Sequence, residues 1–510
     1  MHRRQFLQSS SLAGISLAAS RLGDVADATA AGDTNKQSFD YPIAFGAWIN
    51  DMRSDPVPLT DWPAHQFDDC TVDSAIAVMD LMAAHGWKYL DAFGLWATRA
   101  YPLDIVSAFQ DSARKTLLDR LFQAADQRGV RLFLPLGLMT WGYDEIIAKD
   151  PAVRRQDGVA NPHPSAMCGA QEKSWSSIEK IIDTAMQQYP FAGIHMESAD
   201  QGYCSCPACT GLDGVVGYNA RLNVRCADYV RAKYPGTITM TIPINWLPAA
   251  MTEVGVTPKF TPEEMAHVLE LSQHIDIFMD QGHQWTFTPE DRIGDLHCAY
   301  GTSGGRWLYH SARYDRLAFF VPSPRGTVEN IQRHHAMGVR ACLLYQGPVV
   351  NPGVEINTLA GFMAVSDVQR TWEDILGEII QTKYRPRTPE AARTLRDLLC
   401  TAEEGFYSQW VHADQRFFDI WKIPPRCEWK LNDALFGTSP DPAMYLLEPY
   451  LTPEGRQLYK AALRTSLTLL DSVRHDFDDQ GRIERMRRCL IMSCHLLNSV
   501  IAAKGEPGWN

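Results

Sequence analysis

The stretch His335-Ala336-Met337-Gly338-Val339 decides the fold, because a helical pattern stops there at a glycine just before an apolar run at 341–345. Glycine commonly ends a helix because it takes the left-handed backbone conformation without strain. Helical patterns also end at Gly86 and Gly129, and each is followed by another apolar run. A repeated order of helix, glycine and strand predicts parallel strands joined by helical crossovers.

Eight short apolar runs between about residues 41 and 366 are the candidate strands. They are residues 43–49, 89–93, 130–136, 193–196, 238–244, 275–279, 307–310 and 341–345. Helical patterns lie between and after them, at 72–85, 115–128, 176–188, 218–233, 262–272, 328–337 and 356–364. Eight strand–helix units closed into a ring form a (β/α)8 TIM barrel, which we predict for residues 38–366. The rival is an open doubly wound sheet, but the glycine-rich dinucleotide fingerprint of that fold does not follow the first run.

The remainder of the chain, 367–510, shows only helical patterns. Their main pieces are 368–384, 389–413, 453–477 and 482–503, with proline-rich joints between them. We therefore predict an all-helical C-terminal domain that follows the barrel.

The first 37 residues have the pattern of an export signal. Arg3-Arg4-Gln5-Phe6-Leu7 is a twin-arginine pattern, and the mild apolar stretch 12–19 is too short to span a bilayer. Ala28-Thr29-Ala30 offers a small-residue cleavage site. We predict a twin-arginine signal and linker over 1–37 and a periplasmic or extracellular location, with no membrane span in the mature chain.

Composition limits the partners of the chain. Its 510 residues carry a net charge of −12, with 45% hydrophobic and 21% charged residues, as in an ordinary globular protein. A net negative charge argues against nucleic acid as a partner, because phosphates would be repelled. An anionic small substrate is compatible with it, since a local arginine cluster can dominate a pocket. A homodimer is left open.

Polar residues that follow the predicted strands form the candidate site, because the loops after the strands build the active site of a barrel. Glu197, Asp280 and Asp51 are carboxylates of the kind that cleave a glycosidic bond, one as acid and another as nucleophile or base. A structural salt bridge is the alternative for each. Amides bind sugar hydroxyls, and indole faces stack on sugar rings. The candidate substrate-binding residues are Arg53, Trp96, Arg99, Trp141, Asn245, Trp246, His310, Gln346 and Asn357.

Three cysteines within six residues, Cys204, Cys206 and Cys209, follow the fourth predicted strand. With Cys168 as a fourth ligand they would form a closed tetrahedral thiolate site for a structural zinc. A disulfide within this cluster is the alternative, and spacing alone does not choose between them. Catalysis itself is expected to need no cofactor.

The motif Gly193-Ile194-His195-Met196-Glu197, followed by Cys-x-Cys-x2-Cys, resembles barrel glycoside hydrolases of the α-glucuronidase-like superfamily. The stretch from Glu355 through Trp372 to Tyr384 is similar to them as well, so the resemblance covers roughly 41–385. It implies Glu197 as the acid, and Asp280 from a later strand as the base. The retaining pattern has a nucleophilic Glu after strand seven, where this chain reads Tyr309-His310-Ser311. That difference favours inversion by an activated water.

A looser resemblance starts at the first strand. Residues 45–51, Phe-Gly-Ala-Trp-Ile-Asn-Asp, look like the same region of barrel-type inverting sialidases. This resemblance implies Asp51 as base, with His163 or His195 as acid. Both resemblances imply a sugar that carries a carboxylate, which arginine binds bidentately. Arginines available for this are Arg53, Arg99, Arg154, Arg155 and Arg313.

The sequence therefore predicts an exported glycoside hydrolase that removes a uronic or sialic acid from an oligosaccharide or glycoconjugate. An inverting sialidase is the alternative within enzymes. A non-catalytic carbohydrate-binding barrel is the alternative outside them.

Overall fold

The structure is a computed structural model. It describes residues 38–45, 69–92, 110–140, 142–156, 166–199, 203–211, 213–243, 246, 260–280, 293–303, 320, 322–345, 352–407 and 453–503. Residues Gln37–Asn510 form one compact unit.

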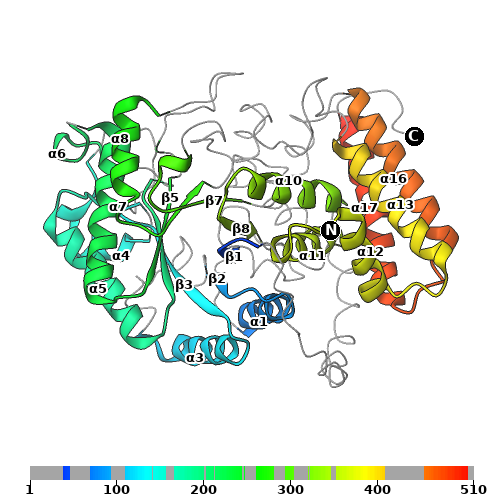
Figure 1. Cartoon of the computed structure of the whole chain (residues 1–510), viewed down its shortest axis with the longest axis horizontal. Helices are drawn as coiled ribbons and strands as arrows, with labels where there is room; N and C mark the ends of the chain where they lie inside the picture. Colours follow the sequence, from blue (N-terminus) through cyan, green and yellow to red (C-terminus); the bar gives the residue numbers. More distant parts are fainter. Residues whose placement is uncertain are drawn as a thin grey trace, which may run out of the picture. The chain divides into compact units, whose positions relative to one another are not determined.

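Eight parallel strands close into a barrel in the order in which they occur along the chain (Figure 1). They are β1 (Tyr41–Phe45), β2 (Tyr89–Asp91), β3 (Arg131–Leu136), β4 (Gly193–Glu197), β5 (Ile238–Ile242), β6 (Ile277–Asp280), β7 (Ala299–Ser303) and β8 (Ala341–Tyr345). The ring closes where β1 pairs with β8, with Phe45 opposite Tyr345. The predicted (β/α)8 TIM barrel is confirmed.

The helices that follow the strands surround this ring. Those described are α1 (Asp69–Ala84), α3 (Ser112–Gln127), α4 (Asp144–Lys149), α5 (Glu172–Gln188), α6 (Pro207–Thr210), α7 (Gly214–Lys233), α8 (Pro262–Leu271), α10 (Pro324–Ala336) and α11 (Pro352–Ser366), with 3-10 turns at Pro151–Val153 and Ile293–Asp295. Gly86, Gly129 and Gly338 follow α1, α3 and α10 with φ of 73°, 66° and 87°. These values confirm the left-handed glycine expected between each of these three helices and the next strand.

One predicted strand was misplaced. The run 307–310 lies outside the described residues, and the seventh strand is β7, eight residues earlier at its first residue. The sequence of β7, Ala-Tyr-Gly-Thr-Ser, has little apolar character, whereas Trp-Leu-Tyr-His at 307–310 is more apolar. Residues 309–311 therefore do not directly follow the seventh strand, which ends at Ser303. They do not occupy the place where retaining enzymes carry the nucleophilic Glu.

The barrel interior is packed with side chains. On one side the ring of Phe133 fills the space beside Gly193, where a Cβ atom would lie 2.4 Å from the ring. A Cβ at Gly301 would lie 2.7 Å from the side chain of Met279. Glycine at these two positions leaves room for a large side chain of the preceding strand. The interior is thus a packed core and not an open channel.

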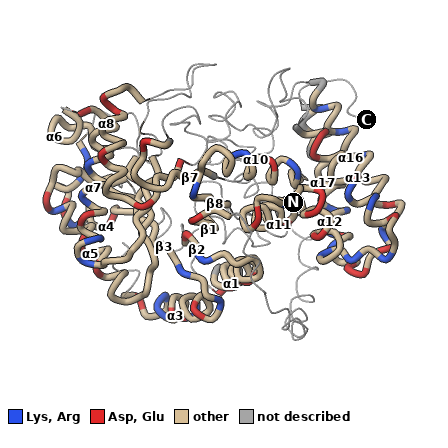
Figure 2. Tube along the Cα trace, viewed as in Figure 1, with Lys and Arg blue, Asp and Glu red and all other residues tan. Residues whose placement is uncertain are grey.

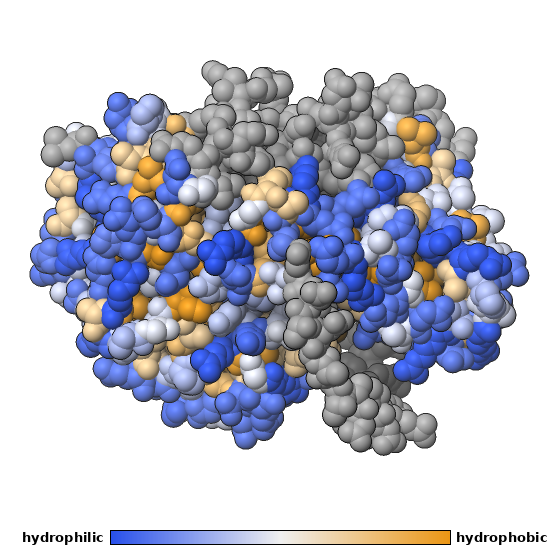
Figure 3. Space-filling view, in the orientation of Figure 1, coloured by the Kyte–Doolittle hydropathy of each residue, from blue (hydrophilic) through white to orange (hydrophobic). Residues whose placement is uncertain are grey.

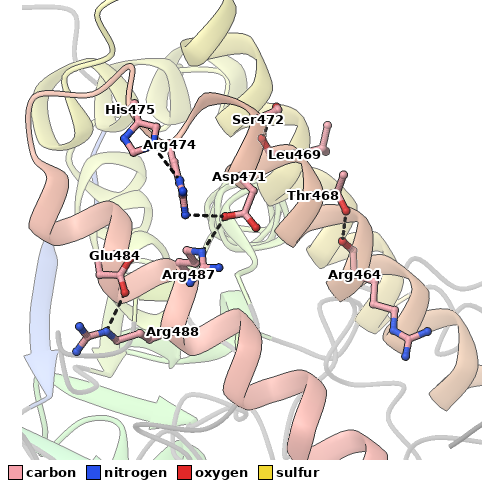
Figure 4. A network of polar contacts seen from close by, with 10 residues as sticks. All are labelled: Arg464, Thr468, Leu469, Asp471, Ser472, Arg474, His475, Glu484, Arg487 and Arg488. Carbon is pink, nitrogen blue, oxygen red and sulfur yellow. Dashed lines mark hydrogen bonds and ion pairs between the residues drawn. The ribbon is translucent and has the colours of Figure 1, made fainter. Parts of the chain in front are cut away.

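The C-terminal part is helical, as predicted. Its described elements are α12 (Trp372–Ile379), a π-helical turn at Ile380–Tyr384, α13 (Pro389–Tyr407), α16 (Pro453–Val473) and α17 (Gln480–Ala503). Helices α13, α16 and α17 lie side by side (Figure 1). Figure 4 shows how charges join α16 to α17: Arg487 Nε donates to Asp471 at 2.8 Å, and Arg474 approaches the same carboxylate at 3.8 Å.

Buried and partly buried polar contacts connect these helices to the barrel. Glu403 of α13 accepts hydrogen bonds from Ser323 Oγ at 3.1 Å and from the backbone N–H of Gly326 at 2.8 Å, at the start of α10. Arg482 of α17 forms an ion pair with Glu355 of α11 at 2.5 Å. The boundary predicted at residue 366 thus lies between helices that share these polar contacts.

The surface is charged and mixed. Figure 2 shows acidic and basic residues interspersed along outer helices such as α3, α5 and α13. Hydrophilic residues cover much of the face in Figure 3. Within the described residues, no helix combines the length and the apolar character that a membrane span requires.

Candidate active site

Glu197 lies at the carboxyl end of β4, where a barrel enzyme places its chemistry. Its side chain is 2% exposed. Side chains alternate along a strand, so Glu197 shares a face with His195. That face is the barrel interior, because His195 lies 6.3 Å from the ring of Phe45 across the barrel and pairs with Asp91 of β2.

Asp91 and His195 are in close contact inside the barrel, on the interior face that also carries Glu197. His195 Nδ1 lies 2.6 Å from Asp91 Oδ2, and both side chains are fully buried. A carboxylate at this nitrogen favours the tautomer that carries the proton on Nδ1. The contact with Asp91 restricts the orientation of the imidazole of His195.

Ser198 anchors the backbone directly after Glu197. Its Oγ accepts hydrogen bonds from Trp246 Nε1 at 3.0 Å and from Asn223 Nδ2 at 3.1 Å. Asn223 Oδ1 in turn accepts from Thr241 Oγ1 of β5 at 3.1 Å. All these side chains are buried, so the network holds the end of β4 against α7 and β5.

Asp280 occupies the opposite face of the sheet. Phe278, two residues earlier on β6, packs against Trp246 on the outer side of β4 and β5, with ring centroids 6.3 Å apart. Alternation puts Asp280 on that same outer side. Tyr300, opposite Phe278 in the register, donates its hydroxyl to Asp280 Oδ2 at 3.1 Å. The geometry therefore separates Asp280 from the interior face of Glu197, and we do not assign it the role of base.

Trp246 and Asn357 are buried, which corrects their expected place against a substrate. The indole of Trp246 is 0% exposed, and its nitrogen donates to Ser198. The carboxamide oxygen of Asn357 accepts the backbone N–H of Ser323 at 2.5 Å. Both side chains make hydrogen bonds within the protein, and neither is exposed enough to contact a sugar.

The other site candidates fall outside the described residues. They are Asp51, His163, Arg53, Trp96, Arg99, Trp141, Asn245, His310, Gln346 and Arg313. Of the remaining arginines, Arg154 is exposed and Arg155 is buried in the segment after β3.

The four predicted cysteine ligands come together beside this site. The sulfur atoms of Cys168, Cys204, Cys206 and Cys209 all lie within 4.8 Å of one another, and all four residues are buried. The structure holds them as free thiols. They join the segment after β3 to the segment after β4, close to Glu197 in sequence.

Asp91 is a residue of this site that the sequence analysis did not single out. It ends the short strand Tyr89–Asp91, and its charge there is a signal, because a carboxylate seldom ends a buried strand without a partner. The partner could not be named beforehand, since β2 and β4 are not neighbours in the barrel.

No protein-family model matches the chain, and no curated protein matches it. Two solved structures resemble it over most of its length. One is a GH138 enzyme targeting pectin rhamnogalacturonan II, with a TM-score of 0.54 and 10% identity over 92% of this chain and 72% of that one. The other is a family GH115 4-O-methyl-α-glucuronidase with specificity for decorated arabinogalactans, with a TM-score of 0.53 and 12% identity over 93% of this chain.

This chain spans 57% of the length of the GH115 structure, which is less than two thirds. At identities of 10% and 12%, both likenesses show a shared fold alone.

Proposed function

We propose that this chain is an exported glycoside hydrolase that releases an acidic sugar, a uronic or sialic acid, from an oligosaccharide or glycoconjugate. The position of Glu197 carries the proposal: a buried carboxyl group on the interior face of the barrel, at the carboxyl end of β4. The resemblance to solved structures named as glycoside hydrolases, one of them a glucuronidase, supports the reaction class.

In this proposal Glu197 is the general acid. Its proton passes to the glycosidic oxygen as the bond from that oxygen to the anomeric carbon breaks. A water molecule adds to the anomeric carbon from the opposite face and gives its proton to a carboxylate base, so the configuration inverts. With Asp280 on the outer side of the sheet, Asp51 after β1 is the carboxylate that we propose as the base.

Three single variants test this assignment. The wild type, Glu197→Gln, Asp51→Asn and Asp280→Asn are assayed on methylumbelliferyl uronides, methylumbelliferyl sialosides and pectic oligosaccharides, whose leaving groups need a proton. The proposal expects wild-type hydrolysis, a loss of at least about 100-fold for Glu197→Gln and for Asp51→Asn, and a smaller effect of Asp280→Asn.

Other outcomes contradict the proposal in distinct ways. A selective loss in Asp51→Asn with full activity in Glu197→Gln would favour the sialidase arrangement with a histidine acid. A folded wild type that binds these glycans without hydrolysing them would identify a carbohydrate-binding barrel.

A further inference from the structure

We infer that Cys168, Cys204, Cys206 and Cys209 form a closed structural zinc site that fastens the segment after β3 to the segment after β4. The inference concerns metal binding and does not depend on the proposed glycosidase activity.

Distances between the sulfur atoms distinguish the metal from a disulfide. Cys168 Sγ lies 3.9 Å from Cys206 Sγ and 3.7 Å from Cys209 Sγ. Four sulfurs at about 2.3 Å from one zinc ion, in a tetrahedron, lie about 3.8 Å from each other. A disulfide requires a sulfur separation of about 2.05 Å and joins only two of the four. The observed spacing is therefore that of a metal site, with all four residues as ligands.

Backbone structure around the cluster prepares it for thiolates. The backbone N–H of Gln156 donates to Cys204 Sγ at 3.3 Å, a contact that stabilises negative charge on sulfur. Cys206 occupies the N-cap position of the short helix α6. The Cys209 N–H donates to the Cys206 carbonyl at 2.9 Å, and this turn brings Cys209 back towards Cys206. The Cys-x2-Cys spacing of this turn is the one that zinc knuckles use.

The ligands come from two segments that are far apart along the chain. Cys168 sits on a short antiparallel bridge between Arg154 and Met167, where its N–H donates to the Val153 carbonyl at 2.8 Å. The other three ligands follow Glu197 by seven to twelve residues. Arg221 of α7 holds the far end of this segment by donating to the Cys209 carbonyl at 2.9 Å.

The metal is structural in this site, because four cysteine ligands leave no open position for water or substrate. Its role is to fix the segment that follows Glu197, in addition to the hydrogen bonds that Ser198 makes with Asn223 and Trp246. Folding of this region is therefore coupled to metal binding.

Metal analysis of the full chain tests the inference. The protein is produced in zinc-supplemented medium, desalted and analysed by mass spectrometry for metals. We expect about one zinc per chain in the wild type, and less than about one fifth of that in Cys206→Ser and Cys209→Ser. The matched control is Cys226→Ser, a buried cysteine of α7 outside the cluster, which should keep its zinc.

Two measurements on the wild type keep the inference testable if the variants do not fold. Replacing zinc with Co²⁺ should give the visible absorption of a tetrahedral cobalt thiolate, and chelation should lower Tm by roughly 5 °C or more. Peptide mapping after alkylation should find all four cysteines as free thiols. The inference would be overturned if the protein produced in zinc-supplemented medium held no metal. A disulfide between any two of the four cysteines would overturn it as well.

Discussion

At the scale of single residues, the direction of a strand decides which carboxylates can act together. Glu197 and Asp280 both end a strand, yet one faces the barrel interior and the other faces the surrounding helices. The sequence predicted that both residues lie near strand ends, but it did not predict which face of the sheet each side chain occupies. Strands of a parallel barrel are buried on both faces, so a run such as Ile277-Phe278-Met279 shows no polar alternation from which to read the inner side.

The first prediction concerns Asp280→Asn. This change replaces the buried carboxyl group that accepts a hydrogen bond from the Tyr300 hydroxyl with a neutral amide, which is a weaker acceptor. We therefore expect the free energy of unfolding to fall by about 1–3 kcal/mol. Because Asp280 faces away from Glu197, kcat of the folded variant should fall less than about tenfold. Denaturant unfolding and steady-state kinetics measure the two effects. Unchanged stability together with a loss of kcat as large as in Glu197→Gln would restore Asp280 as the base.

At the scale of elements, the helix–glycine–strand units were predictable, whereas β7 and the cap of α10 were not. Glycine after α1, α3 and α10 marks the end of each helix and can be recognised from the local sequence. The strand β7 has weak apolar character, so the more apolar run at 307–310 was predicted as the seventh strand instead. The cap of α10 comes from Glu403, about eighty residues later, which no local pattern can indicate.

The second prediction follows from that long-range cap. The carboxylate of Glu403 accepts the N–H groups of Arg325 at 3.3 Å and Gly326 at 2.8 Å at the positive end of α10. We expect Glu403→Gln to lower the free energy of unfolding by about 1–3 kcal/mol, because the charge that matches these donors is lost. The matched control is Glu404→Gln at the exposed neighbouring position, with an expected effect within about 0.5 kcal/mol. Equal effects in the two variants would contradict the capping role.

The third prediction concerns the pH dependence of stability. Burial, reinforced by the positive charge of Arg333, lowers the pKa of His334 in α10 to about 3. The unfolded chain takes up a proton near pH 6.5 and the folded chain does not, so stability is lost as pH falls from 6.5 towards 3. The slope from this residue is at most about 1.4 kcal/mol per pH unit.

Unfolding measured between pH 4 and pH 7 checks this slope. His334→Gln should flatten the curve, and the exposed His495→Gln should leave it unchanged. A His334→Gln variant with the wild-type slope would show that another group controls the acid loss of stability.

At the scale of the whole molecule, ring closure was predictable because eight units occur in one order along the chain. Residues far apart in sequence meet only through that closure, as Phe45 and Tyr345 do. The contacts between Arg482 and Glu355 and between Glu403 and α10 arise at this level too. They depend on how the C-terminal helices pack, which helical periodicity alone does not specify.

The fourth prediction concerns export, which we propose from the twin-arginine pattern. Arg3→Lys combined with Arg4→Lys should hold the chain in the cytoplasm as an uncleaved precursor, because the signal depends on the arginine pair. Fractionation of producing cells and the mass of the chain measure this. The matched control is Arg21→Lys, outside the pair, which should be exported normally. Equal export of the paired variant and the wild type would contradict the proposal.

The most direct measurement of the central claim compares two leaving groups in the wild type and in Glu197→Gln. A general acid is needed for a poor leaving group but not for dinitrophenolate, which departs without a proton. We predict that Glu197→Gln loses at least about 100-fold in kcat/KM on a methylumbelliferyl uronide and less than about tenfold on the dinitrophenyl uronide. Equal losses on the two substrates, or no loss on either, would contradict Glu197 as the acid of a glycoside hydrolase.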